Sequence, residues 1–172
     1  MATIAFPDVA PGDLERIEDV RRRRDPAQHA LLGAHVTFVF PSSRDREPFV
    51  RHVSAVAAVT APIPFVLRTA RVLPGVARER FHVALVPDEG YDAMVALHDR
   101  LYTSPLAPAL RHDLPFVPHM TVASAPDRPT CNHIARELNA SGLAITGTLE
   151  ALDVVSVTDA AVRTVCRAPL NG

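Results

Sequence analysis

The chain has 172 residues, of which 48% are hydrophobic and 22% are charged, so it can form one compact domain with a core of its own. Its formal net charge is −1 and its isoelectric point is about 6.7, which argues against a protein that coats long nucleic acids. Tryptophan is absent and aromatic residues make up 5%, which disfavours a binding surface of stacked rings.

The amino-terminal residues carry no basic flank and no long apolar run, so the sequence predicts no signal peptide. No stretch approaches the roughly 20 apolar residues of a membrane span. Cys131 and Cys166 lack the spacing of zinc ligands, and two thiols are compatible with a reducing compartment. We therefore expect a cytoplasmic monomer of a single bilobal domain, residues 1–172, with no metal, no cofactor, no membrane and no stable protein partner.

Hydrophobic periodicity, together with proline and glycine positions, predicts the elements in chain order. For the first half these are a strand at 3–6, a helix at 11–24, a strand at 34–40, a helix at 44–59 and a strand at 63–73. For the second half they are a strand at 81–86, a helix at 91–102, a proline-rich loop at 104–115, a strand at 116–123, a helix at 129–139 that stops at Gly142, a strand at 143–157 with a break near Gly147, and a last segment at 161–167.

The order strand, helix, strand, helix, strand thus occurs twice. A tripeptide of histidine, an apolar residue and threonine begins at the same place in each half, as His35-Val36-Thr37 and His119-Met120-Thr121. The two tripeptides are 84 residues apart, which indicates a repeat of pattern rather than of residue identity. Two related lobes that face each other would place the two tripeptides across a shared cleft.

Residues two apart in a strand point to the same face, so each tripeptide offers an imidazole beside a hydroxyl. Such a set suits a phosphodiester: one neutral histidine accepts a proton from the attacking water, and the other, protonated, donates to the leaving oxygen. The hydroxyls of Thr37 and Thr121 can donate to the non-bridging oxygens. The sequence assigns neither His35 nor His119 to the acid or the base role. A third match, His52-Val53-Ser54, lies in a predicted helix, where its side chains diverge.

Other residues are better explained by structure than by chemistry. We interpret Arg21–Arg24 as a solvated helix end rather than a polyanion site, and Phe116 as core packing rather than a base-stacking ring. His82 alternates within an apolar strand, and we interpret it as a structural histidine. Neither H-x-x-x-H nor C-x-x-C spacing supports a zinc site.

The stretches Ala34-His35-Val36-Thr37-Phe38 and Pro118-His119-Met120-Thr121-Val122 resemble the paired motifs of the two-histidine phosphoesterase superfamily. Its members include bacterial RNA 2',3'-cyclic phosphodiesterases, also called the 2'-5' RNA ligase family. The resemblance implies an α+β fold of two pseudo-symmetric lobes, with antiparallel sheets lining a central cleft and helices on the outside. It implies metal-independent catalysis by His35, Thr37, His119 and Thr121. The chain has Ala34 where a proline is common, and Ser124 where relatives that act on RNA often have arginine.

We therefore expect a cyclic phosphodiesterase whose substrate is an RNA end or a small nucleotide and whose product is a 2'-phosphate. Ligation to a 2'-5' linkage is the reverse chemistry and would be a side activity. Two alternatives stay open: a phosphoesterase for another small nucleotide-derived cyclic ester, and a non-catalytic protein that binds nucleotide or phosphate on the same scaffold.

Overall fold

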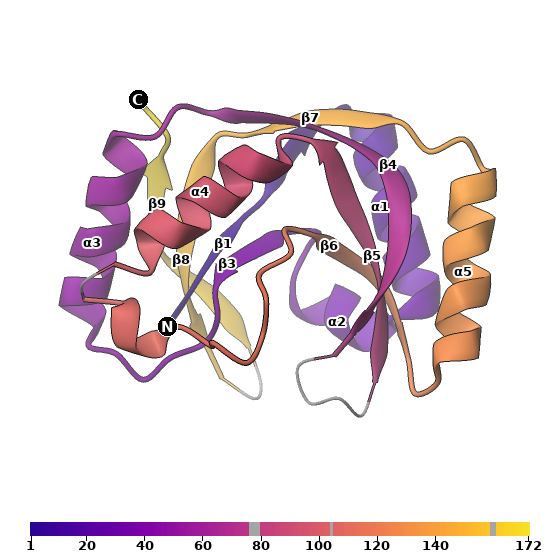
Figure 1. The fold of residues 1–172 in the computed structure, drawn as a ribbon, viewed down its shortest axis with the longest axis horizontal. Helices are drawn as coiled ribbons and strands as arrows, with labels where there is room; N and C mark the ends of the chain where they lie inside the picture. The colour runs from indigo at the N-terminus through magenta and orange to yellow at the C-terminus, as the bar shows by residue number, and fades with distance from the viewer. Residues whose placement is uncertain (76–79, 104, 159–160) are drawn as a thin grey trace.

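The computed structural model describes residues 1–75, 80–103, 105–158 and 161–172 (Figure 1). Nine strands are described: β1 (Ala2–Ala5), β2 (Pro7–Val9), β3 (Val36–Val39), β4 (Ile63–Pro74), β5 (Phe81–Glu89), β6 (Met120–Ala125), β7 (Ile145–Leu149), β8 (Ala151–Val157) and β9 (Val162–Pro169). The helices in the same residues are α1 (Pro11–Arg24), α2 (Pro26–Leu31), α3 (Arg46–Ala58), α4 (Tyr91–Leu101) and α5 (Arg128–Ala140), with a short 3-10 turn η1 (Ala107–Ala109).

The strands form two antiparallel sheets. The first has the order β3-β1-β8-β9 and the second has the order β2-β7-β4-β5-β6. The chain passes from one sheet to the other four times. Two of these passages are single residues between consecutive strands, Phe6 between β1 and β2 and Glu150 between β7 and β8, and the other two run from β2 to β3 and from β3 to β4. Each sheet therefore combines strands from both halves of the sequence, and β3 and β6 are the edge strands that carry the two motifs.

Helices cover the sheets from the outside. Helix α3 packs on β8 and β9, and α4 contacts β3, whereas α5 packs on β4, β5 and β6, and α1 on β6. Figure 1 shows α3 and α5 at opposite flanks of the molecule, with the strands between them. The predicted α+β class with two antiparallel sheets and outer helices is confirmed.

The helix ends follow from local sequence. Helix α4 begins after Gly90, which has a φ of 84°, a left-handed conformation that glycine adopts without steric cost. Helix α5 begins at a cap where the Asp127 carboxylate accepts the N–H of Thr130. It ends at Ala140, and Gly142 follows with a φ of 67°, which confirms the predicted stop.

Several boundaries differ from the prediction; strand β5, for example, continues through Pro87 to Glu89 instead of ending at residue 86. The segments 34–40 and 116–123 become strands only from Val36 and from Met120, so each histidine stands one residue before its strand. The predicted break near Gly147 is wrong, because the strand is interrupted at Glu150, where the chain changes sheets. The short elements β2, α2 and η1 were not predicted, and residue 104 of the predicted loop lies outside the described residues.

No helix in the described ranges is long and apolar enough to span a membrane. Within the same ranges no group of three or more histidine, cysteine, aspartate or glutamate side chains could hold a metal ion.

Candidate active site

The first motif lies at the edge of the four-stranded sheet. Thr37 is the second residue of β3 and pairs with Ile4 of β1, and His35 precedes the strand. Val36, between them, is buried in the core, whereas His35 and Thr37 are half-buried. The alternation predicted from the sequence is therefore present: the apolar residue points into the core, and the imidazole and hydroxyl point to the other side.

The second motif repeats this arrangement at the edge of the five-stranded sheet. Thr121 is the second residue of β6 and pairs with Ala84 of β5, and His119 precedes the strand. Met120 is buried, whereas His119 and Thr121 are half-buried. The two motifs thus occupy equivalent edge positions, one in each sheet.

Both imidazoles are held by the same backbone contact. Nδ1 of His35 lies 2.7 Å from the carbonyl oxygen of Gly33, and Nδ1 of His119 lies 2.6 Å from the carbonyl oxygen of Val117. A carbonyl oxygen only accepts hydrogen bonds, so each Nδ1 carries a proton and donates it. In both rings Nε2 is therefore the nitrogen left to accept or donate a proton.

Burial sets the protonation of both rings. Desolvation lowers the pKa of His35 and the pKa of His119 below the usual value, because burial disfavours the charged imidazolium. The positive charge of His119 is a further cause of the lowered pKa of His35. The two rings, 84 residues apart in sequence, thus lie within electrostatic reach of each other. A positive charge on His119 therefore disfavours protonation of His35.

A threonine hydroxyl accompanies each imidazole, two residues after it in the sequence. Within the described residues neither the Thr37 hydroxyl nor the Thr121 hydroxyl has a hydrogen-bond partner, although both side chains are partly accessible. A hydroxyl beside each imidazole is thus available to donate a hydrogen bond.

A third histidine lies near this pair. His82 of β5 pairs with Ser124 of β6, and its Nδ1 donates to the Ser124 hydroxyl at 2.8 Å. That hydroxyl donates in turn to the Asp25 carboxylate at 2.5 Å, and Asp25 is buried at the end of α1. The charge of His82 contributes to the lowered pKa of His119. The sequence analysis interpreted His82 as structural and did not predict these hydrogen bonds, because His82, Ser124 and Asp25 come from distant segments.

A bulge in β6 brings Ser124 to the site side of the sheet. Thr121 pairs with Ala84 and Ala123 pairs with Val83, so Val122 is an extra residue with no partner on β5. Directly paired residues share a face, and His82 and Ala84 are two apart on β5. Thr121 and Ser124, three apart in sequence, therefore lie on one face.

Aromatic side chains pack against one another beside the two motifs. The ring of Phe116 stacks on the buried ring of His98 with centroids 3.9 Å apart, and it also contacts Phe38. Tyr102 is buried, and its hydroxyl accepts the N–H of Phe40 at the end of β3. Core packing for Phe116 is thus confirmed.

The interpretation of Arg21–Arg24 as a solvated run holds for three of its members and is wrong for Arg21, which is 3% exposed.

Solved structures share this fold over almost their whole length. TT0787 of Thermus thermophilus is 15% identical with a TM-score of 0.61, and the match covers 100% of this chain and 99% of that one. E. coli LigT complexed with 3'-AMP is 17% identical, with a TM-score of 0.61 and 99% of each chain covered. Kluyveromyces marxianus Usb1 is 11% identical, with a TM-score of 0.55 and 98% and 97% covered.

No curated protein is significantly similar to the chain in sequence. The family model of the 2'-5' RNA ligase superfamily, in contrast, matches residues 6–161, which include both motifs. The fold and this match agree, and the chain belongs to the 2'-5' RNA ligase superfamily.

Proposed function

We propose that the protein hydrolyses a 2',3'-cyclic phosphodiester at an RNA end or on a small nucleotide, with His35 and His119 as an acid–base pair. The observation that carries the proposal is the shared orientation of the two rings. Each donates Nδ1–H to a backbone carbonyl and leaves Nε2 for chemistry, at equivalent edges of the two sheets.

The reaction needs one proton removed and one delivered. Nε2 of the neutral histidine accepts a proton from water as the water oxygen bonds to phosphorus. The bond between phosphorus and the 3' oxygen breaks, and Nε2 of the protonated histidine donates its proton to that oxygen. The product is a 2'-phosphate with a free 3' hydroxyl. General acid–base help of this kind contributes about 10²–10⁴-fold, and the Thr37 and Thr121 hydroxyls would stabilise charge on the non-bridging oxygens.

A nucleotide substrate is supported by relatives of the same fold. The E. coli LigT structures contain 3'-AMP, NADP+ and ATP in separate complexes. For this chain we propose a nucleotide or an RNA end that carries the cyclic ester, with 2'-5' ligation as the reverse reaction.

The test uses 2',3'-cyclic mononucleotides and an oligonucleotide with a cyclic phosphate end, in excess chelator. We expect turnover in wild type, and loss of about 10²-fold or more in His35→Asn and in His119→Asn. His133→Asn is the matched control, because His133 is an exposed histidine of α5. Loss in the control as well, or retention in both site variants, would contradict the acid–base pair.

The same assay separates the alternatives. Turnover of mononucleotides without turnover of the oligonucleotide identifies a small-nucleotide enzyme. Binding of the cyclic nucleotides without turnover of either ester identifies a nucleotide-binding protein on the same scaffold.

A further inference from the structure

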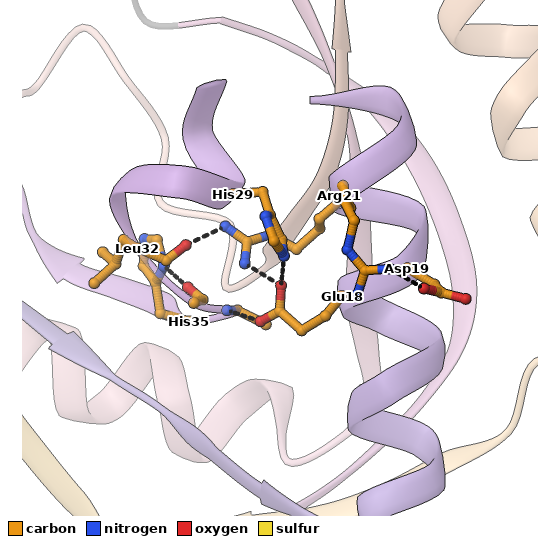
Figure 2. Close-up of polar contacts among 9 residues, drawn as sticks. Glu18, Asp19, Arg21, His29, Leu32 and His35 are labelled. Carbon is orange, nitrogen blue, oxygen red and sulfur yellow. Dashed lines mark hydrogen bonds and ion pairs between the residues drawn. The ribbon is translucent and has the colours of Figure 1, made fainter. Parts of the chain in front are cut away.

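One peptide unit lies between a carboxylate of helix α1 and the ring of His35. The Glu18 carboxylate accepts the N–H of Ala34 at 2.6 Å, and the carbonyl of Gly33 accepts Nδ1–H of His35 at 2.7 Å (Figure 2). The N–H of Ala34 and the carbonyl of Gly33 belong to the same planar peptide bond. The hydrogen bonds therefore run without a gap from Glu18 through this peptide to the imidazole.

A peptide bonded at both ends transmits both position and polarisation. Because the unit is planar, fixing its N–H fixes the direction of its carbonyl, and hence the orientation of the ring that donates to it. A charged acceptor on the N–H strengthens that hydrogen bond, and hydrogen bonds in series polarise one another. The arrangement thus resembles a carboxylate–histidine pair with a peptide unit between its members.

Arg21 holds the carboxylate in place. Its guanidinium donates to Glu18 at 2.7 Å and to the carbonyl of Leu32 at 2.6 Å, and its side chain is 4% exposed (Figure 2). Side chains of helix α1 therefore hydrogen-bond to the backbone that precedes His35 at two residues, Leu32 and Ala34. Burying a charged guanidinium costs desolvation free energy, which its hydrogen bonds to Glu18 and Leu32 offset in part. The same hydrogen bonds fix the backbone that precedes His35.

The second histidine has no such support. The carbonyl that accepts Nδ1–H of His119 belongs to Val117, and the nitrogen of that peptide belongs to Pro118, which has no hydrogen to donate. A carboxylate could not bond to it. Both rings therefore donate Nδ1–H to a backbone carbonyl. Only at His35 does the N–H of that same peptide donate in turn to a carboxylate.

We propose that Glu18 and Arg21 are positioning residues for His35, acting through the peptide between Gly33 and Ala34, so that α1 controls one histidine of the pair and leaves His119 to its own backbone. This inference rests on the proposed function for its catalytic meaning. Its structural content, control of the His35 ring by α1, is separate from turnover.

The charges that face His35 are few. From α1 they are Glu18, which raises the pKa of His35, and Arg21, which lowers it; from the other sheet it is His119, which lowers it. His29 of α2 lies 3.7 Å from Glu18 and completes the group. Because Glu18 and Arg21 act in opposite directions, removing one charge leaves the other uncompensated beside the ring.

The experiment follows the ring protons of His35 and His119 by NMR between pH 4 and 9 in Glu18→Gln, Arg21→Met and the double variant. We expect Glu18→Gln to lower the pKa of His35, because Arg21 keeps its charge. We expect Arg21→Met to raise it, because Glu18 keeps its charge, and the double variant to lie between the two. The pKa of His119 should move less than that of His35 in every case.

The matched controls are Asp19→Asn and Arg22→Met. These residues form the neighbouring pair of α1, also 2.7 Å apart and three residues apart, but exposed to solvent. They should leave the pKa of His35 unchanged. A pKa of His35 that moves no more in Glu18→Gln than in Asp19→Asn, or that moves in the same direction in Glu18→Gln and Arg21→Met, overturns the proposal. If Arg21→Met does not fold, the comparison of Glu18→Gln with Asp19→Asn still decides the proposal.

Steady-state kinetics test whether the positioning of His35 by Glu18 matters for turnover. With the cyclic mononucleotide as substrate we expect kcat to fall by about 10- to 100-fold in Glu18→Gln, as for a group held slightly out of place. The limb of the pH–rate profile that reports His35 should shift with the pKa measured by NMR. If wild type shows no turnover while the NMR shifts appear, the proposed function fails and the positioning stands. If turnover is normal and the shifts are absent, the positioning fails alone.

Discussion

Thr37 and Thr121 stand in equivalent positions, each the second residue of an edge strand and each two residues after a histidine. Neither hydroxyl has a hydrogen-bond partner among the described residues, so each keeps its donor for a ligand. In both cases the apolar residue between histidine and threonine is buried in the core and fixes which way the pair points.

Replacing either threonine by valine keeps the shape and removes the donor. We expect Thr37→Val and Thr121→Val each to lower kcat by about 10²–10³-fold, the usual loss for one hydrogen bond to developing charge. Thr146→Val is the control, because Thr146 is an exposed residue of β7. Steady-state kinetics with a cyclic mononucleotide give the comparison, and a kcat that matches the control would show that these hydroxyls do not act on the phosphate.

Stability should fall as the solution becomes acidic. Desolvation lowers the pKa values of His35, His82 and His119 in the folded protein, so below about pH 6.5 the unfolded chain binds more protons than the folded one. The free energy of unfolding should be constant above this pH and decrease as the pH falls through it. Urea denaturation at pH 7.5, 6.5 and 5.5 measures the trend. His82→Asn should flatten the slope, and an unchanged slope would contradict the assignment for His82.

The hydroxyl of Ser124 links His82 to a buried carboxylate, so its removal leaves two groups without a partner. We expect Ser124→Ala to lower the free energy of unfolding by about 1–3 kcal/mol, the cost of a buried polar group left unsatisfied. Ser141→Ala changes an exposed hydroxyl at the end of α5 and should cost less than about 0.5 kcal/mol. Equal losses in the two variants would show that the chain from His82 to Asp25 contributes nothing to stability.

Gly147 lies where three strands meet, paired with Val9 of β2 and with Phe65 of β4. A Cβ added there would lie 2.5 Å from a methyl carbon of Val9 and 2.6 Å from the Phe65 ring. We expect Gly147→Ala to lower the free energy of unfolding by about 1–3 kcal/mol through overpacking. Gly12→Ala is the matched control, because it stands in the first turn of α1 and a Cβ added there would meet no atom within 4 Å beyond the neighbouring backbone of its own helix. Thermal denaturation should show a lower Tm for the first variant and an equal or higher Tm for the second.

Local patterns predicted much of this fold. The period-two residues of β3 and the apolar stripes of α3, α4 and α5 are visible in the sequence, because each element buries one face. Val36 and Met120 showed which way the motifs face, and Gly142 showed where α5 stops. These signals depend only on residues within one turn or one strand.

Features that depend on distant residues were missed. Gly147 was expected to break a strand, yet it is needed because Val9 and Phe65 approach it closely. Arg21 was grouped with three solvated arginines, since its acceptor at Leu32 is a tertiary contact. One signal was available: Glu18 precedes Arg21 by three residues, the spacing of a helical ion pair.

The passage of the chain between sheets at Phe6 and Glu150 has a consequence for how the molecule assembles. Strand β1 lies between β3 and β8, and β4 lies between β7 and β5, so neither sheet is complete until segments from opposite ends of the polypeptide have met. Such pairing closes long loops, which slows folding. The conformational entropy of loop closure is then lost in one step, when the distant segments pair. A fragment that ends after β4 would possess one motif and no intact sheet, so the two imidazoles should become structured together or not at all.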